Sequence, residues 1–547
     1  MTRIMHGWKT NASLRTPTPK HGFSINLLLE SARRHGTTLL RNCPIDLNMR
    51  ILNTTQIREL DAYTIRNEPV ASIDLMERAS RAFCDWFIVR VDATKKVGIV
   101  CGTGNNGGDG LAIARLLNDW GYQVKVWIVR GGVSESADFK TNEERLPENV
   151  DKEDVLESTD RFNFTGRDVL IDAVFGSGLS RPPSDIYARV IDAINAVQAL
   201  KLAVDIPSGL MADSHSTPPI VRADYTISFQ LPKLAFMLPE CYAFTGDWRV
   251  VDIGLHKNFI REAATPYHYT KAKDVRKILR PRSKFDHKGT FGHALIIAGS
   301  YGKTGAAVLA SKAALRTGVG LLTVHTPQKG YDIIQTSVPE AMAIVDEDPF
   351  LFTSPGDVKR YNAVGIGPGL GQDKRTATAL ARTLGNFGKP VVLDADALNL
   401  IAGNDALLQL VPEGSILTPH PKEFERLAGS WKNDFERLEM QRQLAVSLRS
   451  VIVLKGAHTS IANKDGQVYF NSTGNPGMAT GGTGDVLTGI VTGLLAQNYS
   501  PFEAAVAGVF LHGLAGDIAV SEIGMASMIA SDLITSFPRA YVSIAKK

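Results

Sequence analysis

The chain is poor in cysteine, in long apolar runs and in net charge, and each shortage excludes a class of protein. Its 547 residues include four cysteines without a CxxC pair, so neither a zinc site nor a disulfide framework is predicted. We find no apolar run near the ~18 to 20 residues that span a bilayer, so no membrane association is expected. The net charge of +4 is small for this length, which argues against nucleic-acid binding. Scattered thiols fit a reducing cytoplasm, where we expect the protein to act.

The remaining composition is that of an ordinary globular protein. Hydrophobic residues make up 44% of the chain and charged residues 21%, which excludes wholesale disorder. A chain of this length exceeds what one hydrophobic core usually supports, so we expect two large domains.

Residues 1–48 differ from the rest. The stretch up to Cys43 is basic, with Glu30 as its one acidic residue. We expect an extension without a fold of its own, either a disordered tail or sequence translated from too early a start, and an organellar transit peptide is the alternative. Met49 stands directly before the first segment with clear patterning, so the first domain is expected to begin there.

Both halves of the remaining chain alternate short apolar runs with helical segments, which predicts an α/β fold with parallel sheets. Residues 49–265 are expected to form the first domain, a Rossmann-like parallel sheet with strands at 96–100, 123–129, 168–172 and 201–205. Residues 289–547 form the second, with strands at 294–298, 320–324, 363–366, 391–394, 415–418 and 451–454. The polar, basic stretch 266–288 shows no strong strand and is expected to be the junction. The halves share no visible repeat.

A glycine-rich loop follows the first strand of the N-terminal domain. Residues 102–107 match the dinucleotide fingerprint, but the next strand ends without an acidic residue that could hold a ribose, which disfavours an ordinary NAD-dependent dehydrogenase. Asn105, Asn106 and Asp109 stand among these glycines, so side-chain oxygens could face a cation or a substrate hydroxyl while backbone N–H groups approach an anion. A tight turn would need the glycines alone, and it remains the structural alternative.

Three motifs at strand ends, GTGNNGGDG, DAVFGSGL and DIPSGL, together resemble the NAD(P)H-hydrate epimerase domain, the YjeF N-terminal family. The resemblance implies a substrate site made by Asn105, Asn106, Gly107, Gly108, Asp109, Gly176, Ser177, Gly178, Leu179, Ser180, Arg181, Pro182 and Asp205. It also implies a potassium ion held by Asn106, Asp172 and Ser208, whose oxygens are hard ligands suited to an alkali cation. Asp205 is the candidate acid/base. A helix cap or loop tie is the alternative for Asp205.

The densest motif of the chain is NPGMATGGTGDVLTG, over residues 475–489. So many glycines before an apolar helix predict a phosphate-binding helix N-terminus, where Asp485 could accept the proton of an attacking hydroxyl. It is not a Walker P-loop, because the one GKT sequence has Ile297 where the leading glycine should be. The arrangement instead resembles the ribokinase-like fold.

Four earlier motifs, GIGPGLG, DADAL, TPHPKE and KGAHT, precede GGTGD in this order. The set resembles the ADP- or ATP-dependent NAD(P)H-hydrate dehydratase family. It implies Mg²⁺ with an adenine nucleotide bound by Lys455, Gly456, Ala457, His458, Thr459 and Gly484. It implies a substrate face made by Ala306, Gly369, His420 and Asp485, with Asp485 as the catalytic base. A histidine between two prolines would otherwise be taken as structural.

The two resemblances together predict a metabolite-repair enzyme. The first domain would interconvert the R and S epimers of hydrated NADH and NADPH (NADHX and NADPHX), and the second would dehydrate the S form. Its partners would be these small molecules and the nucleotide, with no nucleic acid and no membrane, and the resemblance suggests a homo-oligomer. One alternative is a ribokinase-like kinase for a small alcohol or vitamin precursor, and another treats the N-terminal domain as a binding module without catalysis.

Overall fold

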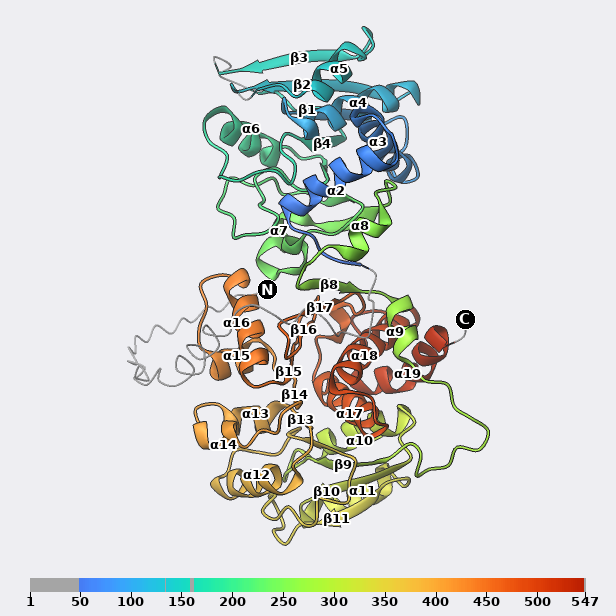
Figure 1. Ribbon diagram of the computed structural model, residues 1–547, viewed down its shortest axis with the longest axis vertical. Coiled ribbons are helices and arrows are strands. Elements are labelled where there is room, and N and C mark those ends of the chain that lie inside the picture. Colours follow the sequence, from blue (N-terminus) through green and yellow to red (C-terminus); the bar gives the residue numbers. More distant parts are fainter. Residues whose placement is uncertain (1–48, 133, 158–161, 546–547) are drawn as a thin grey trace, which may run out of the picture.

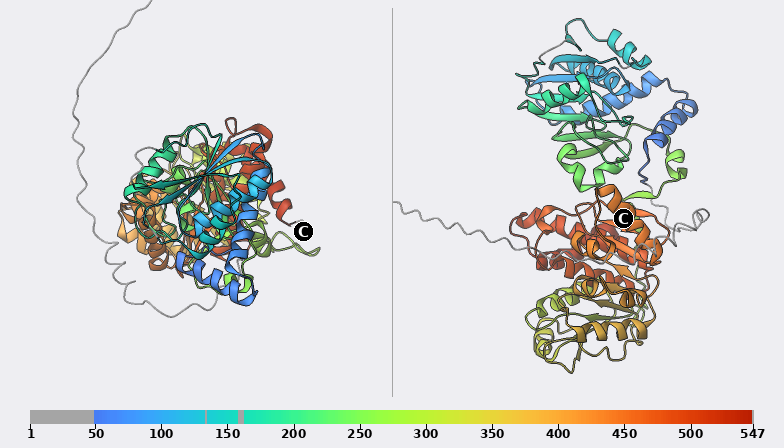
Figure 2. Two further views of the ribbon diagram at one scale, coloured as in Figure 1. Left: turned by 90° about the horizontal axis from the view of Figure 1, so that it is seen from above. Right: turned by 90° about the vertical axis from the view of Figure 1, so that its left-hand side faces the viewer.

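The computed structural model describes residues 49–132, 134–157 and 162–545, and these form two α/β domains stacked along the long axis of the molecule (Figures 1 and 2). The N-terminal domain is built on a seven-stranded sheet and the C-terminal domain on a ten-stranded sheet. The expected two-domain α/β fold is confirmed. The expectations for residues 1–48 lie outside the described residues.

The N-terminal sheet has the strand order β3-β2-β1-β4-β5-β6-β7, and every neighbouring pair is parallel. Its strands are β1 (Lys96–Cys101), β2 (Gln123–Arg130), β3 (Asp151–Leu156), β4 (Val169–Ala173), β5 (Leu200–Val204), β6 (Tyr225–Phe229) and β7 (Asp247–Val251). This is the Rossmann order with one strand added, and it reverses between β1 and β4. Ligands of such sheets bind beyond the carboxyl ends of the strands at this reversal.

Helices cover both faces of this sheet. They are α2 (Thr54–Asn67), α3 (Ser72–Ile88), α4 (Asn105–Asp119), α5 (Ala137–Glu144), α6 (Asp185–Ala196), α7 (Tyr242–Thr245) and α8 (Lys257–Glu262), with 3-10 turns η1 (Leu234–Met237) and η2 (Pro239–Cys241). The core under α3, α4 and α5 lies on one face, and the core under α6 lies on the other. Their apolar faces pack on a sheet buried from both sides, as parallel sheets require.

The C-terminal sheet has the order β11-β10-β9-β12-β13-β14-β15-β16-β17-β8. Its strands are β8 (Tyr267–Thr270), β9 (His293–Ile297), β10 (Leu321–Thr326), β11 (Met342–Val345), β12 (Ala363–Ile366), β13 (Val391–Leu393), β14 (Ile416–Leu417), β15 (Val451–Leu454), β16 (Ser460–Ala462) and β17 (Val468–Asn471). The strands from β11 to β15 are parallel, whereas β16 is antiparallel to both neighbours. The order reverses between β9 and β12.

Two helical layers enclose this sheet, with α10, α17, α18 and α19 on one side and α12 to α16 on the other (Figure 1). The helices are α9 (Ala272–Ile278), α10 (Thr304–Arg316), α11 (Tyr331–Ser337), α12 (Lys374–Phe387), α13 (Ala395–Ile401), α14 (Asp405–Gln409), α15 (Pro421–Ala428), α16 (Asp434–Ser447), α17 (Thr483–Ala496), α18 (Pro501–Ile523) and α19 (Ala530–Ala545), with 3-10 turns η3 (Gln328–Gly330) and η4 (Pro476–Met478).

The helix α18 contradicts the expectation about apolar runs. α18 has 23 residues and is apolar enough to cross a membrane by length and composition, so the expectation that no apolar run reaches this length was wrong. The helix is instead a core element, because 72% of its apolar window is buried and it contacts α9, α17 and α19. A helix that is apolar all round is buried either in a membrane or in a large core, and here the surrounding helices supply the core.

The expected junction also differs from the structure. Residues 266–288 contain β8, which pairs with β17 and forms the edge of the C-terminal sheet, and α9, which packs on α18 and α19. The first described segment joins the same edge, since Ile51 N donates to Tyr267 O (3.0 Å) and Tyr269 N donates to Met49 O (2.8 Å). The strand escaped detection because its sequence, YHYT, is short and polar.

Candidate active sites

Close backbone contacts place the N-terminal motifs side by side at the reversal between β1 and β4. A Cβ on Gly107 would overlap the carbonyl oxygen of Gly102, and one on Gly102 would overlap the carbonyl oxygen of Val174. Only glycine allows the loop after β1, the start of α4 and the loop after β4 to approach this closely. The N-cap of α4 is Gly104, and no side chain caps this helix, so its first N–H groups face the loop.

Three oxygen-bearing side chains meet beside these loops. Ser208 Oγ donates to Asp172 Oδ1 (2.6 Å), and Ser208 N donates to Asp172 Oδ2 (2.7 Å). Asn106 Nδ2 donates to Val204 O (2.9 Å), and Asn106 Oδ1 is buried without a hydrogen-bond partner. Burial is the main reason that the pKa of Asp172 is raised to about 6.

The donor set fits an alkali cation. A buried amide oxygen without a partner is costly, and a cation at this position would satisfy it. The amide, carboxylate and hydroxyl oxygens of Asn106, Asp172 and Ser208 are hard ligands of the kind that such ions take. The positive charge would also offset the burial that disfavours an ionised Asp172.

Asp205 lies directly after β5 in a left-handed conformation (φ +67°) and is tied to a buried lysine. Lys233 Nζ donates to Asp205 Oδ1 (2.5 Å), to Ser228 Oγ (2.9 Å) and to Leu231 O (3.3 Å). Phe229 N also donates to Asp205 Oδ1 (3.0 Å). All the described donors to the carboxylate use one oxygen, so the residue is firmly held while Oδ2 stays available to a ligand.

Two further carboxyls interact electrostatically with Asp205. Burial, followed by the charge of Asp205, raises the pKa of Asp61 to about 6. Burial, followed by the charges of Asp205 and Asp61, raises the pKa of Asp109 well above its usual value. The site therefore places two carboxyl groups near Asp205, whose charge is paired with Lys233. Asp109 belongs to a predicted motif, whereas Asp61 was not predicted.

Only the first part of the predicted substrate loop, residues 176–182, contacts the other residues of this site. Gly176 approaches Asn106, since a Cβ on it would lie 3.3 Å from Asn106 Cβ. Arg58 Nη2, on α2, donates to Gly178 O (3.2 Å). The far end of the loop, Ser180 to Pro182, is exposed. A Cβ on Gly108 would lie 2.9 Å from Met76 Sδ, on α3.

The glycine-rich motif of the C-terminal domain begins α17. Gly482 adopts a left-handed conformation (φ +90°) at the N-cap, and Asp485 lies in the first turn. A Cβ on Gly484 would lie 3.6 Å from Lys455 Nζ, so the structure brings together the predicted nucleotide residues Gly484 and Lys455. Burial, followed by the charge of Asp394, raises the pKa of Asp485 to about 6, although Lys455 acts in the opposite direction.

A buried carboxylate organises this site. Asp394 accepts hydrogen bonds from Lys455 Nζ (2.9 Å) and Thr488 Oγ1 (2.6 Å), while Glu423 Oε2 lies 3.8 Å from Lys455 Nζ. Burial alone would lower the pKa of Lys455, but the charges of Asp394, Glu423 and Asp485 raise it above its usual value. Lys455 thus forms its direct ion pair with Asp394 and not with Asp485.

His420 has the structural role that the sequence left as an alternative, and its side chain is also partly exposed. Its Nδ1 accepts from Lys422 N (3.1 Å) and Glu423 N (3.3 Å), so the ring caps α15. Its side chain is nevertheless 44% exposed, and its Nε2 lies 3.3 Å from Glu423 Oε1. Burial is the main reason that its pKa is lowered.

The remaining predicted substrate residues lie at the reversal between β9 and β12. Gly369 has φ +62°, and a Cβ on it would lie 3.1 Å from Ala306 Cβ and 2.9 Å from Lys303 O. Ser300 Oγ donates to Gly369 O (2.8 Å), which joins the loops after the two strands. A polar pocket opens beside them, lined by Gln372, Asn399, Ala402, Gly403 and Arg426.

Several residues of these sites were absent from the sequence prediction. Asp394 and Glu423 stood inside motifs that were recognised, and their strand-end or cap position could have indicated them. Thr488 lies one helical turn after the GGTGD motif. Lys233 and Asp61 carried no sequence signal, because only the fold brings them to Asp205.

Comparisons with known proteins agree with the two halves of the structure. A family model described as YjeF-related protein N-terminus matches residues 72–235, and one described as NAD(P)H-hydrate dehydratase matches residues 294–539. The Bifunctional NAD(P)H-hydrate repair enzyme Nnr of Moorella thermoacetica is 36% identical over 511 residues, covering 90% of this chain and 96% of that protein. The protein of the same name from Escherichia coli is 34% identical over 463 residues, covering 81% and 84%.

One solved structure similar to the C-terminal half is the ADP/ATP-dependent NAD(P)H-hydrate dehydratase of Bacillus subtilis co-crystallised with ATP and Mg²⁺. It is 35% identical, with a TM-score of 0.46, and the match covers 50% of this chain and 97% of that one. The full-length relatives decide the assignment, because they span both domains in a single polypeptide. The chain belongs to the family of bifunctional NAD(P)H-hydrate repair enzymes.

Proposed function

We propose that the protein repairs hydrated NADH and NADPH with both of its domains. The N-terminal domain interconverts the R and S epimers, and the C-terminal domain dehydrates the S epimer at the expense of an adenine nucleotide. The observation that carries this function is a carboxyl group beside glycine-rich loops in each domain, Asp205 at the end of β5 and Asp485 in the first turn of α17.

The dehydratase site has the parts that phosphoryl transfer requires. Asp485 accepts the proton of the ring hydroxyl as the hydroxyl oxygen attacks the terminal phosphate of the nucleotide, and its raised pKa suits proton transfer near neutral pH. The unpaired N–H groups at the start of α17 stabilise the charge on the transferred group. Phosphate then leaves with the C–O bond electrons, and loss of a proton from the adjacent carbon restores the double bond. Mg²⁺ accompanies the nucleotide.

The epimerase site is organised around Asp205. Lys233 and Phe229 N orient the carboxylate through Oδ1, and Oδ2 is the oxygen that can exchange a proton with the substrate. Asn106, Asp172 and Ser208 would hold a potassium ion, which supplies a fixed positive charge beside the substrate loop. The proposal of potassium is supported by the orphaned Asn106 Oδ1 and the all-oxygen donor set.

Fusion of the two activities follows from the chemistry of the substrate. A dehydratase that accepts one epimer leaves the other behind, and an epimerase in the same chain returns it to the usable form. The proposal also includes action in the cytoplasm, supported by the free thiols of Cys84, Cys101 and Cys241. Self-association belongs to the proposal as well and is measured by sedimentation of the purified protein.

Purified protein incubated with both epimers, Mg²⁺, K⁺ and either ADP or ATP tests the function directly. NADH absorbance should rise to complete conversion with at least one nucleotide. With Asp205→Asn, NADH formation should stop once the S epimer is consumed. With Asp485→Asn, NADH should form far more slowly than with the unsubstituted protein. Absence of NADH under every condition would contradict the function and favour a small-molecule kinase.

A further inference from the structure

We propose that Trp248, which belongs to the N-terminal domain, is a positioning residue for the nucleotide-binding loop of the C-terminal domain, Lys455 to Thr459. The inference rests on the proposed function, because it takes this loop as the nucleotide site. It goes further by making the dehydratase site depend on a side chain from the other domain.

The contact that carries the inference is aromatic. Trp248 lies on β7, an edge strand of the N-terminal sheet, and its ring centroid is 5.6 Å from that of His458 at an interplanar angle of 45°. Tyr269, on β8, lies 5.7 Å from Trp248 and 6.3 Å from His458. The ring centroid of Phe236, on η1, lies 5.6 Å from that of Trp248. Trp248 therefore bridges η1 of one domain and the nucleotide loop of the other.

His458 is fixed in one tautomer by its surroundings. Its Nδ1 lies 3.2 Å from the carbonyl oxygen of Asn471, so Nδ1 must carry the hydrogen and donate it. Burial lowers the pKa of His458, so the ring is neutral near pH 7. Nε2 is then a hydrogen-bond acceptor whose direction is set by the ring plane, and Trp248 and Tyr269 hold that plane.

The loop is anchored at both ends and open in the middle. Lys455 is held at one end by Asp394, and His458 is held at the other end by the aromatic contacts. Gly456 and Ala457, between them, are exposed. A loop of this kind binds more tightly when it is fixed beforehand, because less conformational freedom is lost on binding. Trp248 thus contributes to nucleotide affinity without touching the reacting atoms.

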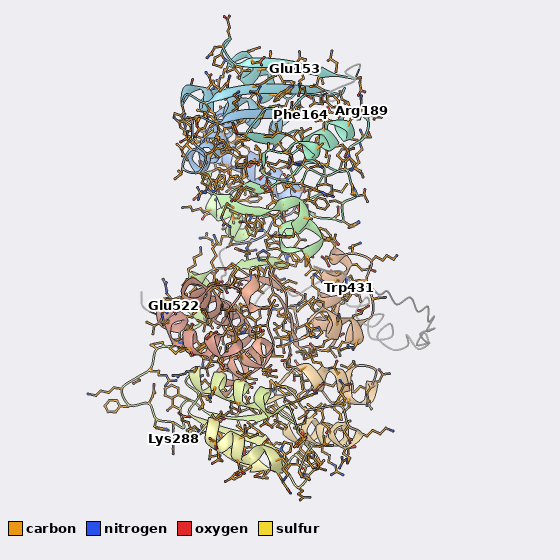
Figure 3. The ribbon with its side chains drawn as sticks, turned by 180° about the vertical axis from the view of Figure 1, so that it is seen from behind. Glu153, Phe164, Arg189, Lys288, Trp431 and Glu522 are labelled. Atoms are coloured by element: carbon orange, nitrogen blue, oxygen red, sulfur yellow. The ribbon has the colours of Figure 1, made fainter. Side chains whose placement is uncertain are left out.

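The domains are joined firmly enough for this contact to persist. Glu240 N donates to Asp434 Oδ2 (2.8 Å), and Asp434 N donates to Glu240 Oε2 (2.6 Å), so each domain caps a helical turn of the other. Arg437 pairs with Asp434 Oδ1 (3.1 Å) and lies over Trp431, which is labelled on the C-terminal domain in Figure 3. One hydrophobic core runs across the boundary, with Phe236 among its members.

Steady-state kinetics of the full chain test the inference. Trp248→Ala should raise the KM for ADP or ATP roughly three- to tenfold, the range expected for losing an aromatic contact. Its dehydratase kcat at saturating nucleotide and its epimerase rate should stay at the level of the unsubstituted protein. Trp248→Phe should restore most of the affinity. Trp120→Ala removes a partly exposed tryptophan at the end of α4 and serves as the matched control.

A double-substitution cycle separates positioning from general packing. If Trp248 acts through His458, then Trp248→Ala should add little to the KM of His458→Ala. Additive effects, or an unchanged nucleotide KM in Trp248→Ala, would overturn the inference. A fall in kcat with no change in KM would also overturn it.

A failure of the proposed function would give a different experimental result from a failure of this inference. If the unsubstituted protein forms no NADH from the S epimer, the repair activity is absent. Titration calorimetry of ADP into Trp248→Ala and Trp248→Phe still measures the nucleotide affinity directly, so the inference can be judged by itself. Intact epimerase activity or a normal thermal transition shows that a variant has folded.

Discussion

The two candidate sites each contain an aspartate and a lysine, but they pair them differently. In the N-terminal domain the buried Lys233 donates directly to Asp205, the candidate acid/base. In the C-terminal domain Lys455 pairs with Asp394, and the candidate base Asp485 remains without this direct compensation. Burial and Asp394 then raise the pKa of Asp485 to about 6. A charge partner thus fixes one carboxylate in place, whereas burial and a like-charged neighbour raise the pKa of the other.

The largest expected effect comes from removing each carboxylate in turn. Asp485→Asn should lower dehydration of the S epimer by about 10²- to 10⁴-fold, the range for loss of a general base, and leave epimerisation unchanged. Asp205→Asn should instead lower epimerisation and leave dehydration of the S epimer unchanged. Each domain is the control for the other, with the epimers separated chromatographically. Loss of both activities in either variant would contradict the separation of the two sites.

Lys233→Met should destabilise the N-terminal domain strongly. The substitution leaves Asp205 without its buried counter-charge, which costs about 3–5 kcal/mol of unfolding free energy. The N-terminal domain should unfold at a lower denaturant concentration than in the unsubstituted protein. Dehydration of the S epimer should persist at denaturant concentrations below this transition. Lys152→Met, on the exposed strand β3, is the control and should change stability little. Equal stability of the two variants would show that the buried pair is not needed.

Asn106→Ala should weaken potassium binding roughly tenfold or more, because it removes the buried amide oxygen that has no other partner. The measurements are the K⁺ concentration for half-maximal epimerisation and the thermal shift produced by K⁺ over Na⁺. The dehydratase rate of the same variant is the internal control. A K⁺ response equal to that of the unsubstituted protein would remove Asn106 from the ion site.

The smallest effect is a shift in pH dependence. Asp485 acts as a base only when ionised, so dehydration should be half-maximal at about pH 6, rise above it and fall below it. The ammonium group of Lys455 lowers the pKa of Asp485, so Lys455→Gln should move this limb to higher pH when kcat is measured at saturating nucleotide. A limb that does not move would show that another group titrates.

Much of the architecture was readable because buried parallel strands are continuous apolar runs. The ten strands expected from the sequence all exist, and their ends agree with the structure to within two residues. Seven strands were missed, and four of these, β3, β7, β8 and β11, are the edge strands of the two sheets. β3 is largely exposed at a sheet edge, and β8 is a four-residue polar segment that becomes a strand only by pairing with β17. Edge strands carry little hydrophobic pattern, so local sequence does not reveal them.

Motifs in the sequence predicted where the candidate sites lie, and the tertiary structure determined which groups balance the charges in them. Glycine spacing at strand and helix ends predicted the loops that hold Asn106, Gly369 and Asp485, since close backbone approach admits no other residue. The counter-charge of Asp205 comes from a lysine 28 residues away, and the ring that steadies His458 comes from the other domain. Such partners come together only when the chain folds, because electrostatic attraction and packing depend on distance in space and not on separation along the sequence.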